Sequence, residues 1–313
     1  MTSMDAYPTW SDDFWREHGD GPWRRGLRLQ QGWWRATQTD LDPGTIKSRD
    51  KPVVSMLPEG VGLEPNLMSL EARQAAEDAI ARMKASKQRG IIEPDRLKRN
   101  LLSSQPLCFN LFGYLSVHTA ALLPWVQALS PQAVSISRVE LEWAPLAEAR
   151  GGSAFDAFVE YRREDGATGF LGIECKYAEK LSESQRADAA EKYRKDTKPP
   201  AWSEDAVEIL DRHGLRQLWY NQLHTQDVAS MPEFAEGLGV VVACAADQDA
   251  QVAVEQVREV LTDPDELRFS SLEDLVNSVE GHDDWKRTFS TRYLDFSPIL
   301  DLLPAGDPRR PTS

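Results

Sequence analysis

The chain has 313 residues, 41% hydrophobic and 27% charged, which is typical of a soluble globular protein with one large core or two modest ones. Its net charge of −14 argues against a surface that binds phosphates throughout, so any nucleic-acid contact must be local. Three scattered cysteines, short apolar runs and no signal-peptide pattern exclude a disulfide framework, a zinc cluster and a membrane span, and predict a cytoplasmic protein.

Residues 1–65 are predicted to form an N-terminal arm followed by a loop. The arm holds half of the ten tryptophans, interleaved with arginines: Trp10, Trp15, Trp23, Trp33 and Trp34, with Arg16, Arg24, Arg25, Arg28 and Arg35. Such a mixture can stack on bases. Large aromatic side chains are usually buried, however, which favours a helical arm that packs its indoles against the main domain.

Residues 66–250 are predicted to form the main domain. A helix is expected over residues 70–86, which are rich in good helix formers, and a second helical stretch over residues 97–129. Residues 82–100 carry seven basic and only two acidic side chains. A basic segment of this kind beside an active site would offset the negative net charge and contact DNA.

The middle of the chain has the two-residue period of β-strands. Strands are predicted over residues 134–143, 155–162 and 168–177, and Gly166 suits the left-handed position that closes a three-residue hairpin between the last two. The apolar residues of both hairpin strands are odd-numbered: Phe155, Ala157, Val159 and Tyr161, then Leu171, Ile173, Cys175 and Tyr177. The register must therefore pair positions of equal parity, and the loop sets their sum at 330.

After a polar, lysine-rich connection, the remaining elements alternate between helix and strand. We predict a helical stretch over residues 203–230, broken near Gly214, and a strand over residues 237–246 that is buried on both faces. Residues 251–313 are predicted to form an acidic helical extension packed on the core. It contains a helix at 250–261, a short strand near 268–269, a helix at 272–279 and a terminal helical segment.

The hairpin register brings candidate metal-binding residues together. It places Asp156 opposite Glu174, with Lys176 on the same face, and opposed side chains have Cβ atoms about 5 Å apart. Two carboxylates at this spacing can hold Mg²⁺, with Mn²⁺ as a substitute, and a neighbouring lysine can orient a water or stabilise developing charge. Gly172 is expected to keep this face open.

A Glu-x-Lys tripeptide alone is a weak signal, because a solvated strand face with a surface ion pair gives the same pattern. Three features favour a metal site: the tripeptide ends an apolar strand, an acid faces it, and the preceding strand adds Glu140 and Glu142 on a polar face.

A second polar group lies on the predicted helix at 203–230. Gln217, Tyr220, Asn221 and His224 share one helical face, with Arg216 beside it. The first three and Arg216 are candidates for supporting the active site or binding nucleic acid. An ordinary solvated or interface face has the same pattern, and a lone histidine is more often structural.

The element order resembles the αβββαβ core of the PD-(D/E)XK nuclease superfamily. The runs SSQPLCFNLFG (103–113), LEWAP (141–145), FDAF (155–158) and GIECKY (172–177) resemble a bacterial group of restriction-endonuclease-like proteins. The resemblance implies an α/β fold with a mixed central sheet flanked by helices. Phe155 stands where many members carry a proline, which weakens the match only slightly.

The resemblance also assigns roles to residues. It implies that Asp156, Glu174 and the carbonyl of Cys175 bind the metal and that Lys176 positions a water. It favours Glu142 over Glu140 as a further ligand, because the LEWAP run places Glu142 close to the strand end.

These observations favour a Mg²⁺-dependent endonuclease that acts on DNA in restriction or phage defence. A catalytically inactive DNA-binding or assembly module of the same fold remains an alternative, although the intact Asp156, Glu174 and Lys176 argue against it. An RNA-directed or repair nuclease is a third. Cutting both strands of a duplex generally needs two active sites, so a homodimer is one of the oligomeric states that the sequence allows.

Overall fold

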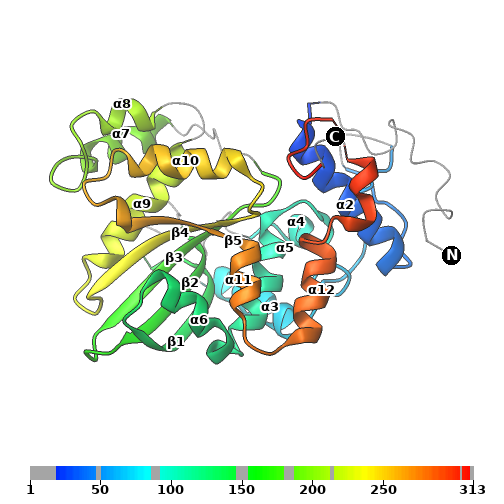
Figure 1. Cartoon of the computed structure of the whole chain (residues 1–313), viewed down its shortest axis with the longest axis horizontal. Coiled ribbons are helices and arrows are strands. Elements are labelled where there is room, and N and C mark those ends of the chain that lie inside the picture. The colour runs from blue at the N-terminus through cyan, green and yellow to red at the C-terminus, as the bar shows by residue number, and fades with distance from the viewer. Residues whose placement is uncertain are drawn as a thin grey trace.

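The computed structural model describes residues 19–46, 51–85, 92–145, 154–179, 187–211, 215–303 and 305–310. A five-stranded sheet lies between two layers of helices, with the helix α2 and the end of the chain beside it (Figure 1). The sequence-based prediction of a mixed central sheet flanked by helices is confirmed.

The strands are β1 (Ala133–Trp143), β2 (Phe155–Arg163), β3 (Thr168–Cys175), β4 (Glu236–Ala243) and β5 (Leu267–Ser271). They lie in the order β1-β2-β3-β4-β5. The pairs β1–β2 and β2–β3 are antiparallel, and the pairs β3–β4 and β4–β5 are parallel. The predicted short strand near residue 268 is therefore β5, and the sheet extends beyond residue 250, where the main domain was expected to end.

The helices before the sheet are α2 (Pro22–Gln38), α3 (Leu70–Ala85), α4 (Pro94–Arg99), α5 (Ser104–Cys108), the π-helix η2 (Phe109–Gly113) and α6 (Thr119–Leu129). Those after β3 are α7 (Ala187–Asp196), α8 (Ala206–Leu210), α9 (Arg216–Ala229), α10 (Gln248–Arg258), η3 (Pro264–Glu266), α11 (Leu272–Ser278), α12 (Asp283–Tyr293) and η4 (Ser297–Leu302). In the described part of the chain, no helix combines the length and apolar character needed to cross a membrane.

The predicted hairpin register is confirmed. Ala157 pairs with Ile173 and Val159 with Leu171, so paired positions sum to 330. Gly166 has a φ of +83° in the connecting turn, the left-handed conformation that glycine adopts without a steric penalty. Asp156 is consequently level with Glu174 on the two neighbouring strands.

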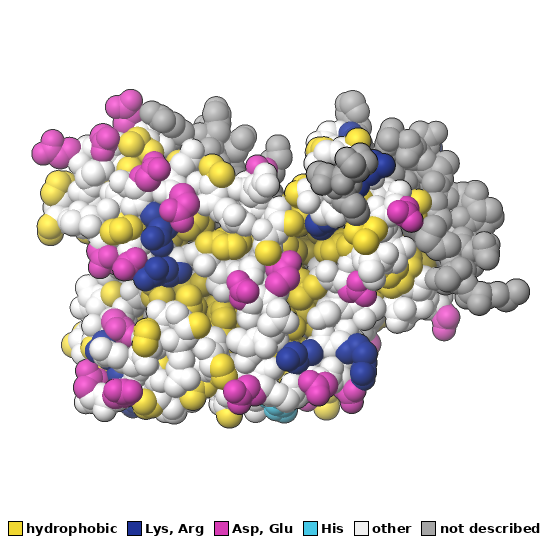
Figure 2. All heavy atoms as spheres, in the orientation of Figure 1, with side chains coloured by type: hydrophobic (Ala, Val, Ile, Leu, Met, Phe, Trp, Pro, Cys, Tyr) yellow, Lys and Arg dark blue, Asp and Glu magenta, His cyan; other side chains and the backbone are white. Residues whose placement is uncertain are grey.

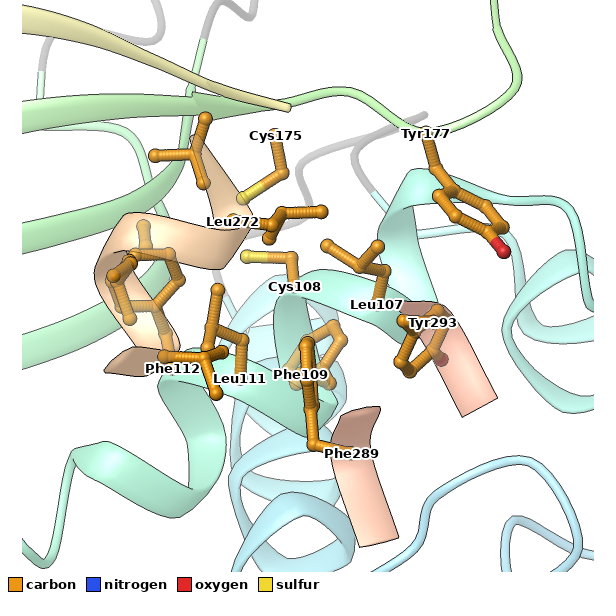
Figure 3. Packing of buried hydrophobic residues seen from close by; sticks show 14 of the residues in the cluster. Leu107, Cys108, Phe109, Leu111, Phe112, Cys175, Tyr177, Leu272, Phe289 and Tyr293 are labelled. Carbon is orange, nitrogen blue, oxygen red and sulfur yellow. The ribbon is translucent and has the colours of Figure 1, made fainter. Parts of the chain in front are cut away.

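The sheet buries both faces. One face packs into the largest hydrophobic cluster, which includes Ala157, Leu171, Ile173 and residues of α2, α3, η2, α6, α11 and α12, and Figure 3 shows part of this cluster around Cys108 and Cys175. The other face packs against α9 and α10. In β4, Val240 and Val242 belong to the first cluster and Val241 to the second, which confirms the prediction that this strand is buried on both sides.

Phe155 departs from the predicted face. Its ring packs with Phe158 and Phe170 on the α9 side, apart from the other odd-numbered residues of β2. Gly172 makes room for it, since a Cβ at that glycine would lie 2.4 Å from a Phe155 ring carbon. The expectation that Gly172 keeps the face open is therefore wrong, because the ring covers it.

The helical stretch expected over residues 97–129 is divided into α4, α5, η2 and α6. The Ser103 side chain accepts a hydrogen bond from the Gln105 N–H and starts α5 as an N-cap. The lysine-rich connection also differs from expectation, because it contains α7, which packs its buried Tyr193 against Tyr220 of α9.

The N-terminal helix α2 packs onto the rest of the protein, as the arm was predicted to do. Its Leu27 and Leu29 are fully buried, and Trp34 stacks on the guanidinium of Arg292 from α12 at 4.2 Å. Trp23 and Trp33 are half-buried against the large hydrophobic cluster that contains Leu27 and Leu29. The other two tryptophans of the arm lie outside the described residues.

Candidate active site

Three acidic residues lie level with one another on adjacent strands. Asp156 is level with Glu174 in the register of β2 and β3. On the other side, Leu141 pairs with Ala157 and Trp143 with Phe155, which puts Glu142 level with Asp156. Glu142 has a φ of +51°, a left-handed conformation that is uncommon outside glycine and often found at functional sites.

Asp156 is at the centre of this row. Its Oδ2 accepts a hydrogen bond of 2.8 Å from the Cys175 N–H. Burial, followed by the negative charge of Glu174, raises the pKa of Asp156 to about 8, while Lys176 acts in the opposite direction. Such a carboxyl group is costly to ionise unless a cation lies beside it.

Glu142 is under similar electrostatic stress. Burial and the charge of Asp156 raise its pKa well above the usual value, and Gln105 of α5 donates a hydrogen bond of 2.7 Å to its Oε1. Glu140 is in a different setting, because it pairs with Arg82 and Arg138 at 3.4 Å each. Of the two acids on β1, Glu142 is thus the one that interacts with the predicted metal ligands.

Glu174 and Lys176 form a buried ion pair. The ammonium nitrogen lies 2.6 Å from Glu174 Oε1, and the side chains are 8% and 5% exposed. Burial lowers the pKa of Lys176, but Glu174 and Asp156 outweigh it and raise the pKa above its usual value. Lys176 is therefore held in its charged form.

Two predicted residues of α9 bind this pair. Gln217 donates a hydrogen bond of 2.5 Å to Glu174 Oε1 and accepts one of 2.8 Å from Lys176. Asn221, one turn further along, donates a bond of 2.6 Å to Glu174 Oε2. The i, i+4 spacing of these two amides places both over the Glu174 carboxylate.

The other candidates on this helix make different contacts. Tyr220 stacks on Tyr193, with ring centroids 3.6 Å apart, and Arg216 pairs with Asp211 at 2.8 Å. His224 is buried and its ring lies against Phe155, with centroids 4.5 Å apart, as expected for a structural histidine.

A further set of contacts around the site was not predicted. Both oxygens of Glu179 accept the N–H of Ser104, at 2.9 and 3.0 Å, and Arg96 pairs with the same carboxylate. The positive charge of Arg96 also acts on the row of acids, because it partly offsets the rise in the pKa of Glu142 that burial and Asp156 cause. Ser104 and Gln105 belong to the run at 103–113, which was noted for its resemblance but not for its chemistry.

Three of the five described basic residues in the segment at 82–100 are paired with acids. Arg82 pairs with Glu140, Arg96 with Glu179 and Arg99 with Asp95. Two more of its bases, at positions 87 and 89, lie outside the described residues. On the face in Figure 2, acidic and basic side chains are interspersed among the coloured residues and form no continuous basic patch.

The donor set suits a hard divalent cation. Carboxylate and carbonyl oxygens are the ligands that Mg²⁺ prefers. The pKa values of Asp156 and Glu142 are raised in the metal-free protein, and a bound cation would favour their ionised forms. Within the described ranges, no three His, Cys, Asp or Glu side chains already stand together as a metal group. The predicted set of Asp156, Glu174, Glu142 and the backbone carbonyl of Cys175 is therefore not gathered into such a group in the described residues, and it stays a prediction.

Most of the chain is similar to a known protein family. A family model described as the PD-(D/E)XK nuclease superfamily matches residues 18–295, which span most of the chain and include the candidate site residues Glu142, Asp156, Glu174, Lys176, Gln217 and Asn221. No curated protein and no solved structure matches.

Proposed function

The chain belongs to the PD-(D/E)XK nuclease superfamily, and on this basis we propose that it is a metal-dependent endonuclease that hydrolyses phosphodiester bonds in DNA. The observation that carries the proposal is the level row of Glu142, Asp156 and Glu174 beside a buried, charged Lys176. A purely structural role would not explain why three adjacent strands bring carboxylates together at the cost of desolvation.

Asp156, Glu174 and the Cys175 carbonyl would hold Mg²⁺, or Mn²⁺ in its place, with Glu142 as a further ligand. When bound, the cation polarises the scissile phosphate. The raised pKa values of Asp156 and Glu142 support this assignment, because a nearby cation removes the repulsion between their ionised forms.

Lys176 would orient the attacking water and stabilise negative charge that develops on the phosphate. Its raised pKa keeps the ammonium group protonated, so it acts as a hydrogen-bond donor and not as a base. Gln217 would fix the position of Lys176 by accepting a hydrogen bond from its Nζ. Asn221 would keep Glu174 aligned by donating a hydrogen bond to its Oε2.

The test is incubation of purified protein with plasmid DNA, single-stranded DNA and RNA, each with Mg²⁺, Mn²⁺ or EDTA. Cleavage of DNA that requires the cation and disappears in Asp156→Ala supports the proposal. Cleavage of RNA alone would identify an RNA-directed nuclease. Tight DNA binding without cleavage under any condition would identify an inactive module.

We further propose a role in restriction or phage defence, supported only by the resemblance of its motif runs to restriction-endonuclease-like proteins. Cells that express the wild-type chain should resist phage infection, and cells that express Asp156→Ala should not. Equal phage plating on both would remove the defence role and leave the biochemical proposal intact. Measuring the mass of the protein on duplex DNA would show whether a homodimer forms.

A further inference from the structure

The chain leaves the sheet directly at the active site. β3 ends at Cys175, and the last ladder contact with β4 is the hydrogen bond of 2.8 Å from the Lys176 N–H to the Val242 carbonyl. The segment that begins with Tyr177 therefore has no strand pairing to fix its direction, although Lys176 must aim its ammonium group at Glu174.

Helix α2 holds this segment from the outside. Gln31 donates a hydrogen bond of 2.8 Å to the Tyr177 hydroxyl, and Arg24, about two turns earlier on the same helix, donates one of 2.7 Å to the Ala178 carbonyl. Two consecutive residues after Lys176 are thus bound by one helix that lies nearly 150 positions earlier in the chain.

Helix α2 is itself fixed by α12. The Gln31 amide also donates a bond of 2.9 Å to the Arg292 carbonyl, and the Arg292 guanidinium donates one of 3.3 Å back to Gln31 Oε1. In Figure 3 the ring of Tyr177 lies near Tyr293, the next residue of α12, and the two rings meet edge to face with centroids 5.4 Å apart. All four side chains are buried.

We propose that α2 is part of the active site and that Gln31 is a positioning residue for Lys176, acting through Tyr177. The inference rests on the proposed nuclease function. Tyr177 packs in the same hydrophobic cluster as Cys175, whereas the Lys176 ammonium group donates a hydrogen bond to Gln217 of α9, so the two side chains diverge from one short stretch of backbone. Fixing the Tyr177 hydroxyl on one side therefore fixes the rotation of the backbone, and with it the direction of Lys176 toward Glu174 on the other.

The test uses Tyr177→Phe, which removes only the hydroxyl, and Gln31→Ala, with Gln30→Ala as a matched control. Gln30 is equally buried on the same helix, but its two hydrogen bonds go to the carbonyls of Thr291 and Asp295 and not to the segment that follows Lys176. The measurements are kcat, KM, thermal unfolding, and hydrogen exchange of the amides at positions 176–179.

Tyr177→Phe and Gln31→Ala are expected to lower kcat about ten- to a hundredfold with little change in KM, as small misplacements of catalytic groups do. Both should accelerate hydrogen exchange at positions 176–179. Because they break the same bond, the double variant should be scarcely worse than Gln31→Ala. Gln30→Ala should lower the unfolding temperature without changing kcat or this exchange.

Unchanged exchange and kcat in Tyr177→Phe would overturn the inference, even if Gln31→Ala proved too unstable to study. Equal loss of kcat in Gln30→Ala would also overturn it, because α2 would then act through general stability. If the wild type cuts no nucleic acid, the proposed function fails, and the exchange at positions 176–179 still decides whether Gln31 orders the segment.

Discussion

The ammonium group of Lys176 lies 2.6 Å from the carboxylate of Glu174 in a setting where both side chains are at least nine-tenths buried. Desolvation often cancels the Coulombic gain of such a pair, so stability alone is a poor reason for it. Gln217 bonds to both members, which makes its amide the contact that fixes their relative geometry.

Gln217→Ala is expected to lower the cleavage rate by misplacing Lys176, and to destabilise the fold by roughly 1.5–3 kcal/mol, since its hydrogen bonds involve charged groups. Gln226→Ala is a matched control on the same helix, because Gln226 also makes two side-chain bonds, one to the Glu266 carboxylate and one to Trp202. Chemical denaturation and single-turnover cleavage of both variants check this. An equal loss of cleavage in both would contradict the role of Gln217.

The metal-free protein should lose stability as the pH rises, because of Asp156. Its pKa is about 8 in the folded protein and 3.8 for an ordinary aspartate, so the folded state binds the proton more tightly. This contribution is complete below about pH 4, declines as the pH rises, and is lost above about pH 8.

The measurement is the free energy of unfolding in EDTA between pH 5 and 8, compared with Asp156→Asn, which mimics the protonated acid. Wild type should fall relative to the variant as the pH rises, and Mg²⁺ should reverse the fall. A difference that is constant or grows in favour of wild type would contradict the assigned environment of Asp156.

Gly172→Ala is expected to destabilise the protein by about 1–3 kcal/mol, because the new methyl group would overlap the Phe155 ring. In a Phe155→Leu background, which frees space at that position, the same substitution should cost less. Thermal unfolding of the two single variants and the double variant tests this. Equal costs in both backgrounds would show that the ring is not what confines Gly172.

The sequence predicts the sheet well where a local pattern determines the structure. Alternation of apolar residues and the turn at Gly166 were sufficient to establish the hairpin register, and the i, i+4 spacing of Gln217 and Asn221 was sufficient to group them on one helical face. The α/β architecture followed from the order of these elements.

Contacts between distant segments could not be predicted in this way. The bonds of Gln105 to Glu142 and of Gln31 to Tyr177 depend on how helices dock on the sheet, and no periodicity reports such docking. The same holds for Phe155, whose ring changes face at the start of β2 because Gly172 leaves space, and for the ion pairs of Arg82, Arg96 and Arg99 in the basic segment.

The central claim is that the hairpin is the catalytic centre, with the acids holding the metal and Lys176 serving the chemistry. The most direct test measures plasmid cleavage and Mn²⁺ binding in parallel for the wild type, Lys176→Ala and Asp156→Ala. We predict that Lys176→Ala abolishes cleavage but still binds Mn²⁺ and DNA, that Asp156→Ala loses both cleavage and metal binding, and that the double variant is scarcely worse than either. Cleavage that persists in either variant, or Mn²⁺ binding that is unchanged in Asp156→Ala, would contradict the claim.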